Sequence, residues 1–303
     1  MRKAREVLVI GGNRYFGKRL IGRLVAAGDR VTVLNRGSSP PPPGVLHLVA
    51  DRDDERALRE AVGTRVFDVV LDQVCYTPRQ AAIARRVLAG RTGRYVMTST
   101  VEVYEHEDSE LLVPEGAVDP HTVAVDLELP WTDPEFLDTH YGEGKRQAEA
   151  VFTADPALPY VSVRVAHVLG GDDDFTGRLQ HYADRIRTGA PIAVAPVTHP
   201  ATYIHVEEIA DFLFWAAGED FTGPVNAASD GLLTLDDLCT AVAAQLPEGR
   251  PVFGVTGSAE VSPFAFRRRY GMDNSRAARL GFAFGDVRQW LPRAVAETLG
   301  KDD

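Results

Sequence analysis

The sequence predicts an α/β fold: a doubly wound parallel sheet followed by a smaller C-terminal lobe. Two observations carry this prediction. Across residues 7–165, short apolar runs alternate with segments of helical periodicity, which is the order of a parallel sheet whose strands are joined by helices. The runs are apolar throughout, as expected for strands that helices cover on both faces. Right-handed crossovers between the strands follow from the same pattern.

The strands and helices of this region can be placed in order from the apolar runs and from the turn residues that end them. The expected strands are 7–10, 31–34, 45–49, 67–71, 95–98 and 160–165. The expected helices are 16–28, 53–62, 79–89 and 141–152, whereas 38–43 and 105–139 are expected to be loops.

The last third of the chain has a less regular pattern. Helices are expected at about 178–188 and 234–245, a short strand at 192–194, and a strand that turns into a helix at 204–217. Thr234 with Asp237 three residues later is an acidic variant of the capping box, which marks the start of a helix. This region is expected to form most of the smaller lobe.

Composition and charge limit the classes of partner. A net charge of −10 disfavours non-specific binding to nucleic acid and to anionic membranes. Two cysteines, Cys75 and Cys239, are too few for a disulfide framework. No apolar run is long enough for a signal peptide or a membrane span. We therefore expect a cytoplasmic protein with a small-molecule substrate and no nucleic-acid or membrane partner.

A glycine-rich turn follows the first expected strand. Glycines there let the backbone approach a pyrophosphate, and the N-terminus of the next helix offers free N–H groups to it. This context predicts a Rossmann-type dinucleotide site, although an ordinary strand-to-helix turn is the alternative. The candidate cofactor-binding residues of the turn are Gly11, Asn13, Arg14, Tyr15, Phe16 and Gly17.

The residues after the second strand favour NADP over NAD. An acidic residue there binds the 2′-hydroxyl of NAD, whereas arginine suits a 2′-phosphate. Asn35 and Arg36 occupy this place, and Arg14 is expected nearby. The alternative is that Arg36 stacks on the adenine of NAD. Asp51 and Arg52, after the third strand, are expected either to contact the adenine or to be turn residues.

One expected helix carries the chain's only Tyr-x-x-x-Lys pair, Tyr141 and Lys145, on one face. The lysine charge is expected to lower the phenol pKa from about 10 and to hold the nicotinamide ribose. The tyrosine then exchanges a proton with a substrate oxygen while hydride moves at the cofactor. An exposed surface pair is the alternative. A third hydroxyl is expected among Thr98, Ser99 and Thr100.

These stretches resemble the extended short-chain dehydrogenase/reductases, in the branch of the NAD(P)-dependent epimerases and dehydratases. The matching segments are GGNRYFG at 11–17, TSTVEVY at 98–104, YGEGK at 141–145, VRVAHVLG at 163–170 and YIHVEEIA at 203–210. The first segment looks like that of an atypical subgroup that includes the chloroplast stem-loop-binding proteins. The resemblance implies an NAD(P)-binding Rossmann domain at 1–165 with about 200–227. It implies a substrate-binding lobe at about 166–199 and 228–303.

The resemblance also implies roles for individual residues. Tyr141 would be the acid/base, with Lys145 as its helper and Thr100 as the third member. Glu102 falls where the family's dehydratases and decarboxylases have a second acid/base glutamate, but the dehydratases' neighbouring aspartate is Val101 here. The remaining cofactor contacts would be Gln73, Lys145, Val165 and His167, with a buried core role as the alternative for His167.

Three functions remain open at this point. The first is an NAD(P)-dependent oxidoreductase acting on a small carbonyl or alcohol. The second is a nucleotide-sugar epimerase or dehydratase with a retained cofactor. The diphosphate-binding arginine of those enzymes is absent from 199–202, and the aspartates at 172–174 would repel a diphosphate. The third is a non-catalytic dinucleotide-sensing or RNA-binding relative. No metal site is expected, and a homodimer through 79–89 and 141–154 is expected by analogy alone.

Overall fold

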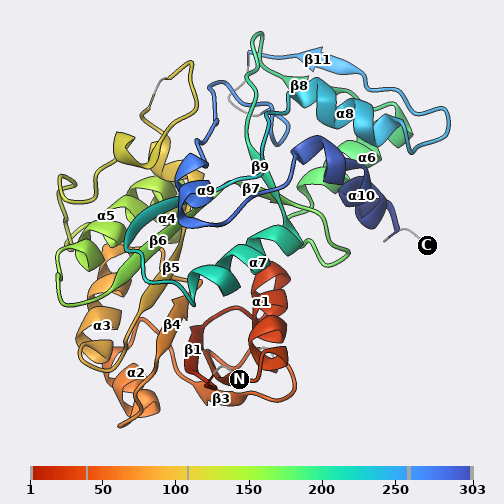
Figure 1. Cartoon of the computed structure of the whole chain (residues 1–303). Coiled ribbons are helices and arrows are strands. Elements are labelled where there is room, and N and C mark those ends of the chain that lie inside the picture. The colour runs from red at the N-terminus through yellow and green to blue at the C-terminus, as the bar shows by residue number, and fades with distance from the viewer. Residues whose placement is uncertain (1–2, 39, 108, 258–260, 301–303) are drawn as a thin grey trace. The chain divides into compact units, whose positions relative to one another are not determined.

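The computed structural model describes residues 3–38, 40–107, 109–257 and 261–300 (Figure 1). The chain divides into two compact units. Unit 1 consists of 1–105, 115–165 and 210–225, and unit 2 of 106–114, 166–209 and 226–303. The assignment of the cofactor to the first predicted region and of the substrate to the second stays a prediction.

The central sheet has seven strands in the order β10-β6-β5-β4-β1-β2-β3. Neighbouring strands pair in parallel from β6 through β3, which confirms the predicted doubly wound α/β fold. The strand order reverses beside β1, where ligand-binding residues gather in such sheets. The strands are β1 (Glu6–Ile10), β2 (Arg30–Asn35), β3 (Leu46–Val49), β4 (Val69–Asp72), β5 (Tyr95–Thr100), β6 (Tyr160–Val165) and β10 (Gly223–Ala227).

Helices cover both faces of the sheet, as the alternation of side chains along β1 shows. Leu8 and Ile10 belong to the core beneath α2 (Glu55–Val62), α3 (Pro78–Leu88) and α5 (Tyr141–Thr153). Figure 1 shows α3 and α5 side by side there, with α1 (Tyr15–Ala26) on the opposite face beside α7 (Val206–Ala216). Arg23 of α1 forms an ion pair with Asp211 of α7 at 2.6 Å.

Three expectations for this region were wrong. The edge strand β3 is largely solvent-exposed rather than covered, because it lies last in the sheet. The segment 105–139, expected to be a loop, contains α4 (Pro134–Thr139) and a 3-10 turn at Glu115–Ala117. Asp133 caps α4 and Pro134 is at its first position, a helix-start signal that the sequence reasoning missed. The seventh strand, β10, was not expected, since its Gly-Pro start reads as a turn.

Unit 2 contains two parallel strand pairs and a helical core. The strands are β7 (His167–Leu169) with β9 (Tyr203–His205), and β8 (Ile192–Val194) with β11 (Phe253–Val255). The helices are α6 (Arg178–Thr188), α8 (Leu235–Ala243), α9 (Ser275–Leu280) and α10 (Val287–Leu299). Thr234 and Asp237 form both hydrogen bonds of the predicted capping box at α8. Among the described residues, no helix is long and apolar enough to cross a membrane.

A buried ion pair joins β6 to α5. Arg164 and Glu149 are both fully buried, and their charged groups lie 2.7 Å apart. Arg164 also donates hydrogen bonds to the Tyr104 hydroxyl and to the carbonyls of Glu115 and Val118. One guanidinium group therefore connects a strand, a helix and two segments of the connection that follows β5.

Removing the Arg164 charge should destabilise the protein strongly, because Glu149 would remain buried without its counter-ion. We expect Arg164→Met to lower the free energy of unfolding by about 3–5 kcal/mol. Arg56→Met is the matched control, since the Arg56–Glu60 pair lies on an exposed helix face. Urea unfolding of the three proteins measures the effect. Equal midpoints for the two variants would show that the buried pair is not a stabilising contact.

Candidate functional site

The turn between β1 and α1 is shaped by its glycines. Gly11 and Gly12 have φ angles of 80° and 81°, in the left-handed region that favours glycine. A Cβ atom on Gly17 would lie 2.3 Å from the Gln73 side-chain oxygen and 2.6 Å from the Cα of Gly12. Only glycine therefore lets α1 start this close to the turn, as close helix–strand packing in a dinucleotide site requires.

Gln73 lies directly beneath this turn, at the end of β4. Its backbone N–H donates to the carbonyl of Ile10 at 3.0 Å. Its side-chain Nε2 is buried and has no hydrogen-bond partner within the part of the chain that the structure describes. A buried donor of this kind calls for an acceptor. The glycine cradle and this donor together fit the pyrophosphate of a dinucleotide.

The other predicted residues of the turn lie just before α1 and in its first two positions. Arg14 occupies the N-cap position of α1 and is exposed, with no capping bond from its side chain. Tyr15 is buried with a left-handed φ of 52°, a strain of about 1–3 kcal/mol that proteins retain mostly at functional sites. Phe16 lies beside it, and Asn13 donates to the carbonyl of Pro40.

The residues after β2 differ in their exposure. Asn35 accepts hydrogen bonds from the Gly37 N–H at 2.7 Å and pairs with His47 at 3.0 Å, so this side chain shapes the turn. Arg36 is exposed. Of the two, Arg36 is the one with a guanidinium group available to an anionic ligand.

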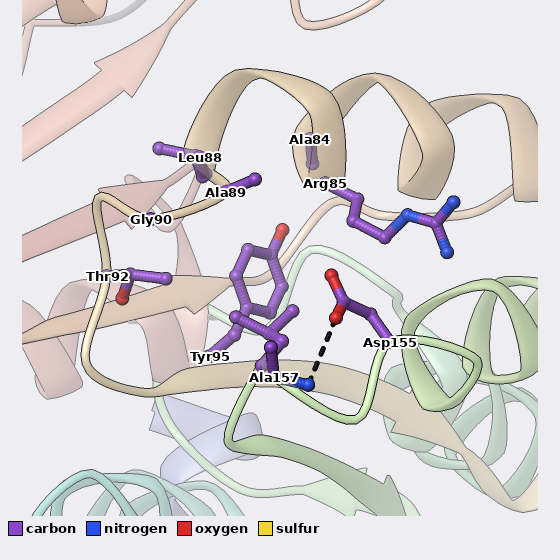
Figure 2. Close-up of a pocket in the computed structure, with 10 residues that line it drawn as sticks. Ala84, Arg85, Leu88, Ala89, Gly90, Thr92, Tyr95, Asp155 and Ala157 are labelled. Atoms are coloured by element: carbon purple, nitrogen blue, oxygen red, sulfur yellow. Dashed lines mark hydrogen bonds between the residues drawn. The ribbon is translucent and has the colours of Figure 1, made fainter.

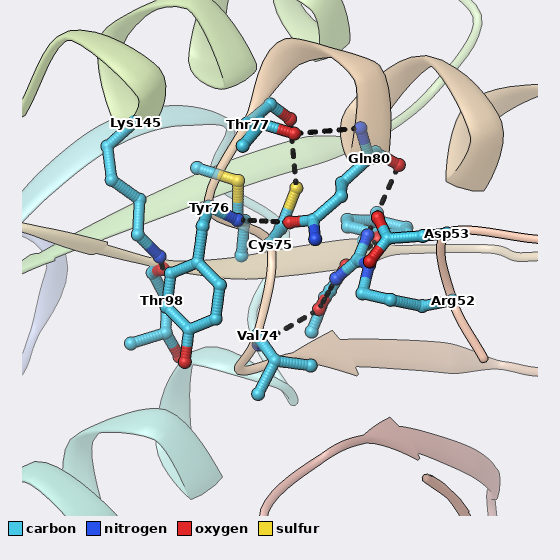
Figure 3. Close-up of polar contacts among 12 residues, drawn as sticks. Arg52, Asp53, Val74, Cys75, Tyr76, Thr77, Gln80, Thr98 and Lys145 are labelled. Carbon is cyan, nitrogen blue, oxygen red and sulfur yellow. Dashed lines mark hydrogen bonds and ion pairs between the residues drawn. The ribbon is translucent and has the colours of Figure 1, made fainter. Parts of the chain in front are cut away.

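Arg52 lies in the turn after β3, one of the two predicted alternatives, and its side chain is buried against the end of β4. Its guanidinium lies 2.6 Å and 2.8 Å from the two carboxylate oxygens of Asp72 and donates to the Gln80 carbonyl (Figure 3). Asp72 also accepts from the hydroxyl of Tyr95 at 2.5 Å. Arg52 therefore fixes the strand end. Asp51 is exposed, and its contact with adenine stays a prediction.

The predicted catalytic pair lies at the start of α5. Lys145 is 1% exposed, and its Nζ donates to the carbonyl of Thr98 at 2.8 Å. The same atom lies 4.6 Å from the ring centroid of Tyr76 and 5.8 Å from that of Tyr141. Burial lowers the pKa of Lys145 to about 8. Tyr141 is 37% exposed, so the pair presents a phenol to solvent above a buried ammonium group.

Two glycines between these residues set how closely α5 approaches the sheet. A Cβ on Gly142 would lie 2.4 Å from the carbonyl oxygen of Glu102, and one on Gly144 would lie 2.4 Å from that of Tyr76. The first contact is with the 3-10 turn η1 (Val101–Tyr104), and the second is with the loop after β4. The glycines of Tyr-Gly-Glu-Gly-Lys therefore bring Lys145 to the end of β5. Sequence reasoning had used only the tyrosine and the lysine.

The three candidate hydroxyls at the end of β5 have different partners. Ser99 donates to buried Glu149 at 2.5 Å, and Thr98 supplies its carbonyl to Lys145. Thr100 caps η1, with its hydroxyl oxygen accepting from the Glu102 N–H at 3.2 Å. Because that oxygen is an acceptor, the Thr100 proton can be donated to a ligand. This arrangement favours Thr100 among the three.

Two further predicted cofactor residues follow at and beyond the end of β6. Val165 pairs with Thr100 in the sheet register. His167 belongs to unit 2, where its ring stacks on Phe266 and lies near Tyr270. Burial and nearby Arg178 and Arg268 lower the pKa of His167 to about 3, so the ring is neutral. A core role accounts for these contacts, and a contact with nicotinamide stays a prediction.

A pocket of about 180 Å³ lies elsewhere in unit 1, where β5 begins (Figure 2). The last turn of α3, the start of β5 and the loop after α5 line it. None of the predicted site residues lines this pocket. The pocket residues are Ala84, Arg85, Leu88, Ala89, Gly90, Thr92, Tyr95, Asp155, Ala157 and Leu158.

Comparison with known families shows which protein family the chain belongs to. The model of the NAD dependent epimerase/dehydratase family matches residues 7–228, which include the glycine turn, the end of β5 and α5. The chain belongs to this family. It is therefore an NAD-dependent enzyme of the short-chain dehydrogenase/reductase type, which confirms the resemblance seen in the sequence.

Individual relatives in this family are distant. Chloroplast stem-loop binding protein of 41 kDa b from Arabidopsis thaliana is 26% identical over an alignment of 262 residues that covers 79% of this chain. The chain spans 62% of that relative's length. UDP-glucose 4-epimerase from Thermotoga maritima, solved with UDP-glucose, is 16% identical with a TM-score of 0.76, covering 98% of this chain and 99% of the epimerase. WbmH from Bordetella bronchiseptica, solved with NAD+, is 16% identical with a TM-score of 0.74, covering 98% of each chain. At these identities the two structures establish the fold.

The glycine packing beneath α5 can be tested by adding one methyl group. Gly144→Ala should destabilise the protein by about 1–3 kcal/mol, because the new Cβ meets the Tyr76 carbonyl rather than a movable side chain. Gly22→Ala in α1 is the control, since open space surrounds that position and alanine favours helix. Urea unfolding should therefore show opposite signs for the two substitutions. A stabilising Gly144→Ala would contradict the close approach.

Proposed function

We propose that this protein is an oxidoreductase that moves hydride between NADP(H) and a small carbonyl or alcohol, with Tyr141 as the proton donor and acceptor. The observation that carries the proposal is the pairing of an exposed phenol with a buried ammonium group one helical turn away. The nicotinamide, when bound, supplies or accepts the hydride. Tyr141 gives a proton to the carbonyl oxygen in reduction and removes it from the alcohol in oxidation.

Lys145 and Thr100 support this proton transfer in different ways. The positive charge of Lys145 favours the ionised form of a phenol on the same helix face. Thr100 offers its hydroxyl proton to the substrate oxygen, because its own oxygen accepts the Glu102 N–H. Both groups are fixed by the end of β5, so little reorganisation is needed as charge develops on that oxygen.

The cofactor would be held by the turn after β1 and by two arginines. Gly11, Gly12 and Gly17 leave room for the pyrophosphate, and Gln73 offers its buried amide. Arg14 and Arg36 are exposed, and guanidinium groups bind phosphate in a bidentate fashion. A 2′-phosphate is the part of NADP that these arginines would recognise, which supports NADP over NAD.

A nucleotide-sugar epimerase with a retained cofactor is the second candidate. The fold neighbour from Thermotoga maritima was solved with UDP-glucose, and Glu102 lies in the 3-10 turn that Thr100 caps. The stretch 199–202 offers no arginine for a diphosphate, which favours a smaller substrate. Net consumption of NADPH with carbonyl substrates supports the first candidate. Tightly held cofactor without net consumption supports the second.

Removing the Tyr141 hydroxyl should abolish proton transfer while leaving the cofactor site intact. Tyr141→Phe is expected to lower kcat by about 10²- to 10⁴-fold, the usual contribution of general acid–base catalysis. Affinity for NADPH, measured by fluorescence titration, should stay unchanged in the same protein. Full activity of Tyr141→Phe would rule out this phenol as the acid/base of either enzyme candidate.

The preference for NADP can be tested at Arg36. Arg36→Ala should weaken NADPH binding by about 10- to 100-fold, the range for losing a charge-assisted hydrogen bond, with little effect on NADH. Arg30→Ala is a control, since Arg30 is an exposed arginine paired with Glu6 at the other end of β2. Calorimetric titration with both cofactors measures the ratio. An unchanged NADPH-to-NADH ratio in Arg36→Ala would contradict recognition of the phosphate by this side chain.

A further inference from the structure

The Lys145 ammonium group has few polar partners for a buried charge. In the part of the chain that the structure describes, its hydrogen bond goes to the Thr98 carbonyl. An ammonium group carries three donors, and burial removes the water that would otherwise accept from them. The other close group is aromatic: the ring of Tyr76, with its centroid 4.6 Å from Nζ. The ammonium group therefore lies over the face of this ring.

Tyr76 is held in this place by its own backbone. It lies in the loop between β4 and α3, where its N–H donates to the Gln80 side chain at 2.7 Å (Figure 3). Two residues later α3 begins, with Thr77 as its cap and Pro78 at its first position. The Tyr76 carbonyl meets α5 at Gly144. The backbone is thus fixed on both sides, while 40% of the residue remains exposed.

We propose that Tyr76 is a positioning residue for Lys145, whose ring face binds the ammonium group and keeps it beside Tyr141 and the end of β5. The negative face of an aromatic ring attracts a cation, and this attraction grows when water is excluded. A leucine would fill similar space without offering that negative face. The consequence for catalysis rests on the function proposed above, whereas the contact between ring and ammonium group does not.

Other charged groups near Lys145 also change its pKa. Asp72 and Glu149 favour the charged form, and so does Cys75 once ionised, whereas Arg52 opposes it. Burial outweighs these effects and lowers the pKa of Lys145 to about 8. Losing the ring should lower this pKa further, because the charged form would lose a favourable contact. The charged fraction of Lys145 at neutral pH would then fall, and Lys145 would stabilise the ionised form of Tyr141 less.

Two substitutions separate the ring face from the hydroxyl. Tyr76→Phe keeps the face, and Tyr76→Leu removes it. The full chain labelled with ¹³C,¹⁵N-lysine gives signals from only four lysines, namely Lys3, Lys18, Lys145 and Lys301. Comparison with Lys145→Arg assigns the signal of interest. Phe253→Leu in unit 2 is the control for losing a half-exposed ring, since Phe253 is 41% exposed.

We expect Lys145 to titrate in Tyr76→Phe and in Phe253→Leu as it does in the wild type. In Tyr76→Leu its midpoint should fall by about 0.4–1.5 pH units, the range of a cation–π contact expressed as a pKa shift. An unchanged midpoint in Tyr76→Leu would overturn the proposal. An equal shift in Tyr76→Phe would overturn it too, because the hydroxyl would then be responsible.

The same experiment separates this proposal from the proposed function, since the titration needs neither cofactor nor substrate. If Tyr76→Leu shifts the midpoint while Tyr141→Phe keeps full activity, the positioning contact stands and the proposed function fails. Where the function holds, the alkaline limb of the kcat profile in Tyr76→Leu should move to lower pH by the shift seen in the titration. Tyr76→Phe should keep the wild-type limb.

Discussion

A single buried ammonium group connects α5 to the carboxyl end of β5 and to the loop after β4. Lys145 reaches the sheet only because Gly142 and Gly144 let α5 contact the backbone at Glu102 and at Tyr76. The charge is then held between the carbonyl of Thr98 and the Tyr76 ring. A larger residue at either glycine would move the helix, and the lysine would lose these partners. The position of the Tyr-x-x-x-Lys pair at the sheet therefore depends on the two glycines that lie inside it.

Two buried ion pairs keep the surrounding strand ends in place. Arg52 and Asp72 fix the end of β4, from which the Gln73–Tyr76 segment continues, and Arg164 with Glu149 ties β6 and α5 to the segments after β5. Pairs of this kind are costly to break, because removing one partner leaves the other charge buried without a counter-ion. The groups that would face a ligand therefore rest on buried charges that each have a counter-ion.

The sequence predicted what depends on local pattern, and it missed what depends on tertiary contact. The strand–glycine–helix order follows from a continuous apolar run, a glycine turn and a helical period of about 3.6 residues. The same helical period places Tyr141 and Lys145 on one face. Tyr76 gave no such signal, because its contact with Lys145 forms only where the loop after β4 meets α5, which is distant in the sequence. Arg52 was expected from its position alone to contact adenine or to be a turn residue. Neither alternative included the ion pair with Asp72, on the next strand along the chain, which holds the Arg52 side chain in the interior. A glycine pair such as Gly142 and Gly144, placed inside a helix at a cost to its stability, was the one available sign of close packing.

The most direct test is a crystal structure of the full chain with NADP+. We expect the pyrophosphate at the glycine turn after β1, the 2′-phosphate at Arg36, and the nicotinamide ribose within reach of Lys145 and Tyr141. The Tyr76 ring should still cover the lysine. A dinucleotide bound elsewhere, for example in the pocket where β5 begins, or a Lys145 that makes no contact with it, would contradict the assignment of this site.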